Sequence, residues 1–358
     1  MSWAWLDWLR EAIGQPQFTL LFAPTVKFLV AVFSILLLIA YLVFAERRLL
    51  GFLQVRLGPN RVGPWGLLQP IADVLKLLIK EDTIPNRAVR WAYLLAPCLV
   101  VAPALIIFSV IPFGPSPTAP GAPRWYVTDL NAALVFVVAL ASLGIYGIIL
   151  GGWASNNKFS LLGGLRSAAQ MVSYEVPQGL ALVGPLMLAG SLSLVGIVES
   201  QARLGLWFAV PQIVAFFVYF VAGVAETNRN PFDLPEAESE LVAGFHTEYS
   251  GVRFALFFLG EYANMIVIAA IAVTVFLGGW LRPFPSVEAL AFLGFVPGIA
   301  WFFLKVFAFL FLFIWFRGTF PRFRFDQLMA LGWKWLIPLS LANVLVTGLV
   351  VVLVDRGP

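Results

Sequence analysis

The amino-acid sequence predicts an all-α polytopic membrane protein with about eight transmembrane helices and one amphipathic helix at the membrane interface. Three observations predict this fold class. The 358 residues are 61% hydrophobic and only 12% charged, whereas about 25% of the residues of a soluble domain are charged. The apolar residues fall in runs of roughly 20, the length with which an α-helix crosses a bilayer core. Between these runs, Lys and Arg gather in alternate loops, as multi-pass membrane proteins require.

Eight apolar runs are expected to span the membrane. Their approximate limits are Thr19–Phe44, Tyr93–Phe113, Asn131–Leu150, Leu161–Ala189, Leu206–Ala225, Val252–Leu281, Ala291–Phe316 and Trp335–Val354. Most of the basic residues follow the first, third, fifth and seventh runs. Because cytoplasmic loops retain basic residues, these loops are predicted to face the cytoplasm, or the matrix of a mitochondrion, and both termini the opposite side. The whole chain, 1–358, is expected to form a single integral membrane domain.

The first long cytoplasmic loop, residues 46–90, contains a segment that is too short and too charged to span a bilayer. In this segment, Leu67–Glu81, polar side chains recur along one side of a helix and leucine and isoleucine along the other. An amphipathic helix that lies along the interface is therefore expected.

The second long cytoplasmic loop, residues 226–251, is rich in acidic residues. They are Glu226, Asp233, Glu236, Glu238, Glu240 and Glu248. Crowded and partly desolvated carboxylates can hold and exchange protons. The loop is therefore a candidate proton relay or charge-sensing switch, and a solvated acidic surface is the simpler alternative.

Three charged residues lie inside the predicted spans: Glu175 in the fourth, Glu261 in the sixth and Lys305 in the seventh. A charged side chain at the centre of a transmembrane helix costs roughly 2.5 kcal/mol or more. Each is therefore expected to face the bundle interior or water and to take part in proton transfer. A purely structural hydrogen bond or ion pair is the alternative for each.

Side chains that could bind a redox group are scarce. The single cysteine, Cys98, can form neither an intrachain disulfide nor a thiolate cluster alone. The single histidine, His246, cannot alone supply the ligands of haem, copper or structural zinc, which usually take several nitrogen or sulfur ligands. We therefore expect this chain to bind no metal and no redox cofactor.

Four charged segments resemble, in content and in order, the signature of the quinone-site membrane subunit of respiratory complex I, the proton-pumping NADH:quinone oxidoreductase. The segments are Glu46–Arg48 with Val55–Pro64 and Gly66–Asp73; Gly152–Asn156 with Ser173–Glu175; Ala225–Phe245 with Glu248, Tyr249 and Phe257–Asn264; and Pro321–Met329. The resemblance covers nearly the whole chain.

The resemblance implies a non-redox subunit at the junction of the hydrophilic and membrane arms, which houses the membrane part of a quinone tunnel. The residues that match the family's proton-transfer and coupling pathway are Glu46, Asp73, Glu175, Glu226, Asp233, Glu236, Glu238, Glu240, Glu248 and Glu261, and Lys305 matches an intramembrane lysine. The residues that the resemblance implies in quinone binding are Arg47, Arg56, Asp73, Arg229 and Arg317.

The same resemblance implies quinone as the substrate, with flavin and iron–sulfur clusters on partner subunits. The implied partners are soluble quinone-site and iron–sulfur subunits, other membrane subunits and lipid, and not nucleic acid. The implied location is the bacterial cytoplasmic membrane, or the mitochondrial inner membrane for an organellar chain. Three alternatives stay open: the homologous membrane subunit of a membrane-bound hydrogenase, an autonomous proton-coupled transporter, and a structural anchor for a soluble arm.

Overall fold

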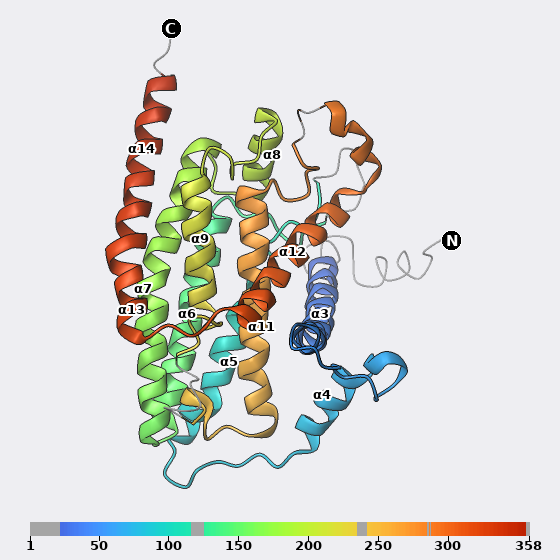
Figure 1. Ribbon diagram of the computed structural model, residues 1–358, viewed down its shortest axis with the longest axis vertical. Coiled ribbons are helices and arrows are strands. Elements are labelled where there is room, and N and C mark those ends of the chain that lie inside the picture. Colours follow the sequence, from blue (N-terminus) through green and yellow to red (C-terminus); the bar gives the residue numbers. More distant parts are fainter. Residues whose placement is uncertain (1–21, 116–124, 235–241, 285, 287, 356–358) are drawn as a thin grey trace.

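The computed structural model describes residues 22–115, 125–234, 242–284, 286 and 288–355, which form helices, turns and loops without any strand (Figure 1). The helices are α3 (Ala23–Leu53), α4 (Gln69–Ile79), α5 (Arg90–Ile107), α6 (Ala133–Ala154), α7 (Lys158–Ala189), α8 (Leu194–Leu204), α9 (Ile213–Glu226), α11 (Gly251–Phe276), α12 (Gly298–Thr319), α13 (Phe325–Ala330) and α14 (Ile337–Asp355). Short helical turns are η2 (Pro64–Gly66), η3 (Gly244–His246), η4 (Glu288–Phe295) and η5 (Leu331–Leu336). The predicted all-α class is confirmed.

In the described part of the chain, six helices are long and apolar enough to cross a bilayer, and a seventh span exists if α7 and α8, which are bent by 57°, count as one. The fifth predicted run, Leu206–Ala225, is helical only from Ile213 onward. The amides of Phe208 and Ala209 donate to Gln201 and to the carbonyl of Phe276 instead of entering a helix. Each predicted run contains a helix, but the predicted count of eight is not confirmed.

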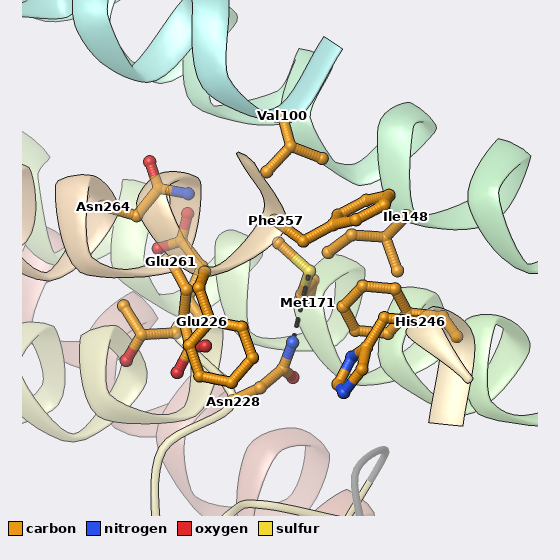
Figure 2. A pocket seen from close by; sticks show the side chains of 12 residues that line it. Val100, Ile148, Met171, Glu226, Asn228, His246, Phe257, Glu261 and Asn264 are labelled. Atoms are coloured by element: carbon orange, nitrogen blue, oxygen red, sulfur yellow. Dashed lines mark hydrogen bonds between the residues drawn. The ribbon is translucent and has the colours of Figure 1, made fainter. Parts of the chain in front are cut away.

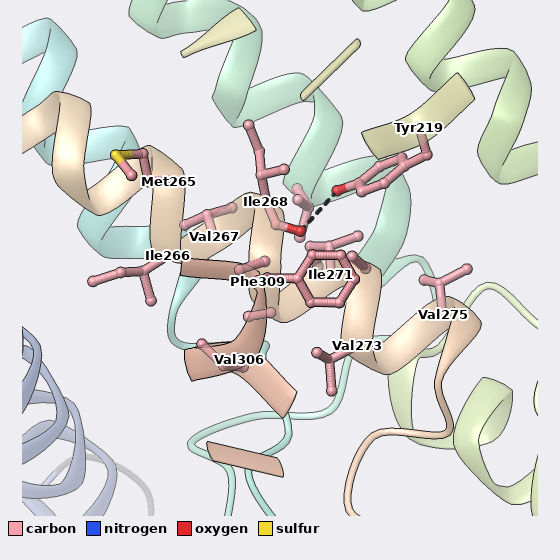
Figure 3. Packing of buried hydrophobic residues seen from close by; sticks show 14 of the residues in the cluster. Tyr219, Met265, Ile266, Val267, Ile268, Ile271, Val273, Val275, Val306 and Phe309 are labelled. Atoms are coloured by element: carbon pink, nitrogen blue, oxygen red, sulfur yellow. Dashed lines mark hydrogen bonds between the residues drawn. The ribbon is translucent and has the colours of Figure 1, made fainter. Parts of the chain in front are cut away.

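Helix α11 lies at the centre of the bundle and packs against α3, α5, α9 and α12. Its residues Met265–Phe276 are buried almost without interruption. Figure 3 shows side chains of this stretch against Val306 and Phe309 of α12 and against Tyr219 of α9. The Tyr219 hydroxyl donates to the carbonyl of Ile268 at 3.3 Å, which ties α9 to α11 within this apolar core.

Small residues allow the helices to approach closely, as is usual where lipid supplies no hydrophobic driving force. A Cβ atom on Gly152 of α6 would lie 2.6 Å from the carbonyl oxygen of Ser160 on α7, and one on Gly223 of α9 would lie 2.5 Å from Ile268 of α11. Glycine at these two positions sets the spacing of helices that carry site residues.

The polar loops converge at one end of the bundle, the lower end in Figure 1. Hydrogen bonds join loops that are far apart in sequence. The Ser250 hydroxyl donates to the Glu81 carbonyl at 3.1 Å, and the Asn230 amide donates to the Phe320 carbonyl at 2.9 Å. We call this region, with residues 54–89, 155–157, 227–234, 242–250 and 320–324, the loop end.

The predicted amphipathic helix forms as α4, beside the lower end of α3 (Figure 1). Three residues of its apolar face, Ile71, Leu75 and Leu78, are each more than half exposed. An exposed apolar stripe on a short helix is what an interfacial helix buries in the lipid boundary. The placement of α4 in the membrane interface therefore stays a prediction that its geometry supports.

Candidate functional site

Four charged residues from four different segments meet where the bundle joins the loop end. Glu46 comes from α3, Arg229 follows α9, Glu261 comes from α11 and Arg317 comes from α12. One guanidinium nitrogen of Arg229 lies 3.1 Å from Glu46, and its Nε lies 2.7 Å from Glu261. Arg317 forms a further ion pair with Glu46. We call these four residues the charge cluster.

The charge cluster is balanced in charge and mostly buried, although the side chain of Arg317 is 42% exposed. Only 2% of Glu46 and 4% of Arg229 is exposed. A buried charge persists only where other groups pair it and satisfy its remaining hydrogen-bonding atoms, and two arginines facing two glutamates meet the first condition. Loss or gain of one proton in this cluster would therefore leave a net buried charge, which makes the cluster sensitive to protonation.

Tyr262 contributes to the charge cluster although the sequence analysis did not single it out. Its hydroxyl donates to Glu46 Oε2 at 2.7 Å, and the Arg229 guanidinium lies over its ring, 4.3 Å from the ring centroid. Burial opposes the charge on Arg229, but Glu261, Tyr262 and Glu46 together raise the pKa of Arg229 well above its ordinary value. Arg229 is therefore a permanent cation. Tyr262 directly follows Glu261 in the sequence, and this position beside an intramembrane glutamate was the signal that could have identified it.

Two small cavities connect the charge cluster with carboxylates deeper in the bundle. The first cavity is lined by Glu226 and Glu261, and the second by Glu175 and Glu226. Asn264 lines both cavities. Figure 2 shows Glu226, Glu261 and Asn264 gathered at one side of the first cavity. The order Glu261, Glu226, Glu175 therefore leads from the charge cluster into the interior, where Glu175 accepts a hydrogen bond from Ser142.

Three further predicted site residues, Arg47, Asp73 and Asp233, form ion pairs near the loop end. Arg47 lies 2.7 Å from Asp73, which joins the end of α3 to α4. Arg322 lies 3.0 Å from Asp233. Burial raises the pKa of Asp233, although Arg322 and Arg317 lower it. Asp233 therefore holds a proton more readily than an ordinary aspartate does.

Other predicted site residues lie apart from the charge cluster. Glu248 accepts a hydrogen bond from the Asn157 amide at 2.6 Å, on the far side of η3. Arg56 is exposed in the turn after α3 and forms no ion pair with another described residue. Three members of the acidic loop, Glu236, Glu238 and Glu240, lie outside the described residues.

Lys305 contacts backbone carbonyls and not a carboxylate among the described residues. Its ammonium donates to the carbonyls of Leu277, Gly279 and Leu281 at 2.7, 2.9 and 2.6 Å. It also lies 4.7 Å from the ring centroid of Trp207. A cation at a helix C-terminus is stabilised by the helix dipole, so this geometry favours the structural alternative for Lys305, a cap on the end of α11.

The described residues contain no group of three or more His, Cys, Asp or Glu side chains that could hold a metal ion. The site therefore offers arginines, carboxylates and a tyrosine hydroxyl. Such groups can bind a polar headgroup and move protons.

Comparison with known proteins gives consistent results along nearly the whole chain. The family model described as NADH dehydrogenase matches residues 26–348. A subunit of the NADH-quinone oxidoreductase of Magnetococcus marinus is 52% identical over 345 residues, which cover 96% of each chain. The same subunit in Geobacter sulfurreducens is 54% identical and covers 90% of this chain and 94% of its own. The one in Paraburkholderia phymatum is 53% identical over 90% of each chain.

Proposed function

Because the chain belongs to the NADH dehydrogenase family, as a membrane subunit of an NADH-quinone oxidoreductase, we propose that it forms the membrane part of the quinone tunnel and couples quinone reduction to proton translocation. One observation supports this proposal best. The charge cluster lies where the bundle joins the loop end, and its member Glu261 is the first of a row of three carboxylates that line two cavities in the bundle. Chemistry at the loop end can therefore change the charge inside the membrane domain.

The loop end has the groups that a quinone requires. A quinone accepts two electrons and two protons, and cations close to its oxygens stabilise the negative charge that develops during reduction. Arg47, Arg56, Arg229 and Arg317 supply such cations, and the carboxylate of Asp73 holds Arg47 in place at 2.7 Å. The exposed apolar face of α4 is suited to the isoprenoid tail where the quinone enters from lipid.

The electrons must come from partner subunits. The only cysteine of the sequence, Cys98, cannot ligate a cluster alone, so flavin and iron–sulfur clusters belong on soluble partners that cover the loop end. Other membrane subunits would continue the proton path. The loops 46–90 and 226–251 would then face the cytoplasm of a bacterial cell whose cytoplasmic membrane holds the enzyme.

Coupling follows from the charge balance of the cluster. Quinone reduction withdraws protons from nearby donors, and a carboxylate that loses its proton in a buried site leaves a charge that the low-dielectric surroundings disfavour. The next carboxylate along the row can restore the charge balance by passing on its proton. Glu226 would pass a proton to Glu261, and Glu175 would pass one to Glu226. The acidic loop, with Asp233 and Glu248 among its described members, would resupply the row.

The proposal is tested by Arg317→Gln in the intact enzyme, with Arg324→Gln as a matched control. Arg317 pairs with buried Glu46, whereas Arg324 is an exposed arginine, 79% accessible, that pairs with exposed Asp326. We expect Arg317→Gln to lower NADH:quinone turnover at least tenfold and to leave NADH oxidation by a soluble electron acceptor within twofold. Arg324→Gln should change neither rate. Equal losses in both assays for Arg317→Gln, or no loss in either, would contradict the proposal.

A further inference from the structure

The first cavity contains buried acceptor atoms that no described residue satisfies. They are Glu226 Oε2 and Asn228 Oδ1, each almost fully shielded from solvent. The amide nitrogen of the same Asn228 donates to the Ser167 hydroxyl at 2.9 Å, and Asn228 lines the cavity. Buried polar atoms of this kind are normally satisfied by ordered water, which needs two to four polar partners and sufficient room. The cavity has a volume of about 30 Å³, which leaves room for about two water molecules beside these polar atoms.

His246 lines the same cavity from the opposite side. It belongs to η3 at the loop end and is 7% exposed. Figure 2 shows its ring at one side of the cavity, with Glu226 and Glu261 at the other. The rings of Phe245, Phe254 and Phe258 pack around the imidazole edge to face.

The titratable groups that face the imidazole across the cavity are Glu226 from α9 and Glu261 from α11. The other helices contribute side chains that do not ionise, Val100 from α5, Ile148 from α6 and Met171 from α7. The cavity is therefore a small, mainly apolar space with one imidazole on one side and two carboxylates on the other.

We propose that ordered water in this cavity connects His246 with Glu226 and Glu261, and that His246 transfers protons from the loop end to these carboxylates. This inference rests on the proposed function and adds a residue to it. A water takes up a proton from the loop end and passes one to the unprotonated ring nitrogen, while the proton on the other nitrogen passes to the next acceptor. The imidazole begins and ends neutral, and a ring flip restores the starting tautomer. No cation needs to persist in the cavity, which agrees with the way that burial lowers the pKa of His246 to about 4.

The test compares His246→Gln with Ile148→Val in the intact enzyme reconstituted into vesicles. Glutamine keeps a polar side chain of similar reach but cannot exchange a proton, and valine at 148 changes only the apolar wall. General acid–base groups contribute about 10²–10⁴-fold, so we expect His246→Gln to slow proton translocation at least tenfold and to increase its solvent deuterium isotope effect. Oxidation of NADH by a soluble acceptor should stay within twofold. Ile148→Val should leave the translocation rate, its isotope effect and the soluble-acceptor activity unchanged.

Several outcomes would overturn the inference. The inference fails if His246→Gln shows the same translocation rate and isotope effect as Ile148→Val. It also fails if His246→Gln loses soluble-acceptor activity to the same extent as translocation, which would indicate a structural role. Glu226→Gln separates this inference from the proposed function. If Glu226→Gln stops translocation and His246→Gln does not, the proposed function stands and the histidine relay fails; if neither variant affects it, both fail. Should His246→Gln not assemble, a high-resolution map of the intact enzyme decides, because a cavity without water density between His246 and Glu226 overturns the relay.

Discussion

Tyr262 shows how one hydroxyl can support a buried group of charges. Its hydroxyl is a neutral donor to Glu46, which otherwise depends on Arg229 and Arg317. Removing one partner of a buried charged acceptor costs about 1–3 kcal/mol. We therefore predict that Tyr262→Phe lowers the thermal midpoint of the purified enzyme and reduces quinone turnover, as measured by calorimetry and by an NADH:quinone assay. Tyr146→Phe is the control, because Tyr146 is 60% exposed on α6; equal effects of both substitutions would contradict the prediction.

The burial of His246 also predicts how stability depends on pH. The folded protein lowers the pKa of His246 from 6.5 to about 4, so folding favours the neutral imidazole. Its stabilising contribution is then complete above pH 6.5 and is lost as the pH falls toward 4, where unfolded chains bind a proton that the folded chain does not. The full difference corresponds to about 3 kcal/mol. Thermal midpoints between pH 7 and pH 5 should fall more steeply for the native enzyme than for His246→Gln; parallel curves would contradict this.

The sequence identified most of the charged residues of the site but not their partners. Glu46 and Arg229 are 183 positions apart, and Glu46 and Arg317 are 271 apart. Charge inside or beside an apolar run marks a residue as costly and hence functional, which is why Glu175, Glu261 and Lys305 stood out. Which charge meets which depends on helix packing that a single sequence does not encode locally. For this reason the carbonyl ligands of Lys305 could not be foreseen.

At the scale of elements, hydrophobic run length predicted the helices well because lipid allows few alternatives. A backbone in hydrocarbon must satisfy its own hydrogen bonds, so a long apolar run has to be helical. The predicted start of one run, Leu206–Ala225, was wrong because its first residues are not helical. The amides of Phe208 and Ala209 donate to Gln201 of α8 and to Phe276 at the end of α11 instead of entering a helix. The amino-acid composition of the run does not indicate these two bonds. The polar and apolar sides of α4, by contrast, were evident from spacing alone.

Lys305 links two elements, and its loss should be visible as a loss of stability. Three carbonyls at the end of α11 would lose a charged donor in Lys305→Met, and hydrogen bonds to charged groups are worth about 1.5–3 kcal/mol each before the cost of burying the ammonium is subtracted. We expect a net loss of about 2 kcal/mol, measured as a lower thermal midpoint, and equal falls in quinone and soluble-acceptor activity. Lys27→Met, on the exposed side of α3, should have no such effect. A selective loss of quinone-coupled translocation at unchanged stability would instead support a role for Lys305 in proton transfer.

At the scale of the whole molecule, the bundle brings together loops from four places along the chain. The alternation of basic loops predicted that these segments share one side, and hydrogen bonds such as Ser250 to Glu81 and Asn230 to Phe320 confirm that they meet. The row of carboxylates could not be predicted in the same way. Glu226 lines both cavities only because α9 ends at the depth where α7 carries Glu175 and α11 carries Glu261.

This row predicts that the carboxylates act as one system. If a proton passes between Glu175 and Glu226 across the second cavity, then Glu175→Gln and Glu226→Gln each interrupt the same transfer, and Glu→Gln removes the charge while it keeps the size. We expect each single variant to lower proton translocation at least tenfold with soluble-acceptor activity intact, and the double variant to be little worse than either. Groups that act as a unit are non-additive, whereas distant independent sites add within about 0.5 kcal/mol.

Glu199→Gln provides the matched control for this cycle, because Glu199 is an exposed glutamate on α8, away from both cavities. It should leave translocation unchanged and should add nothing to Glu226→Gln. The measurement is the initial rate of proton movement into vesicles that contain the intact enzyme, divided by the rate of NADH oxidation. Normal ratios in both Glu175→Gln and Glu226→Gln would mean that protons do not follow this row. Fully additive losses would mean that the two carboxylates act separately, since a single file of protons cannot be interrupted twice.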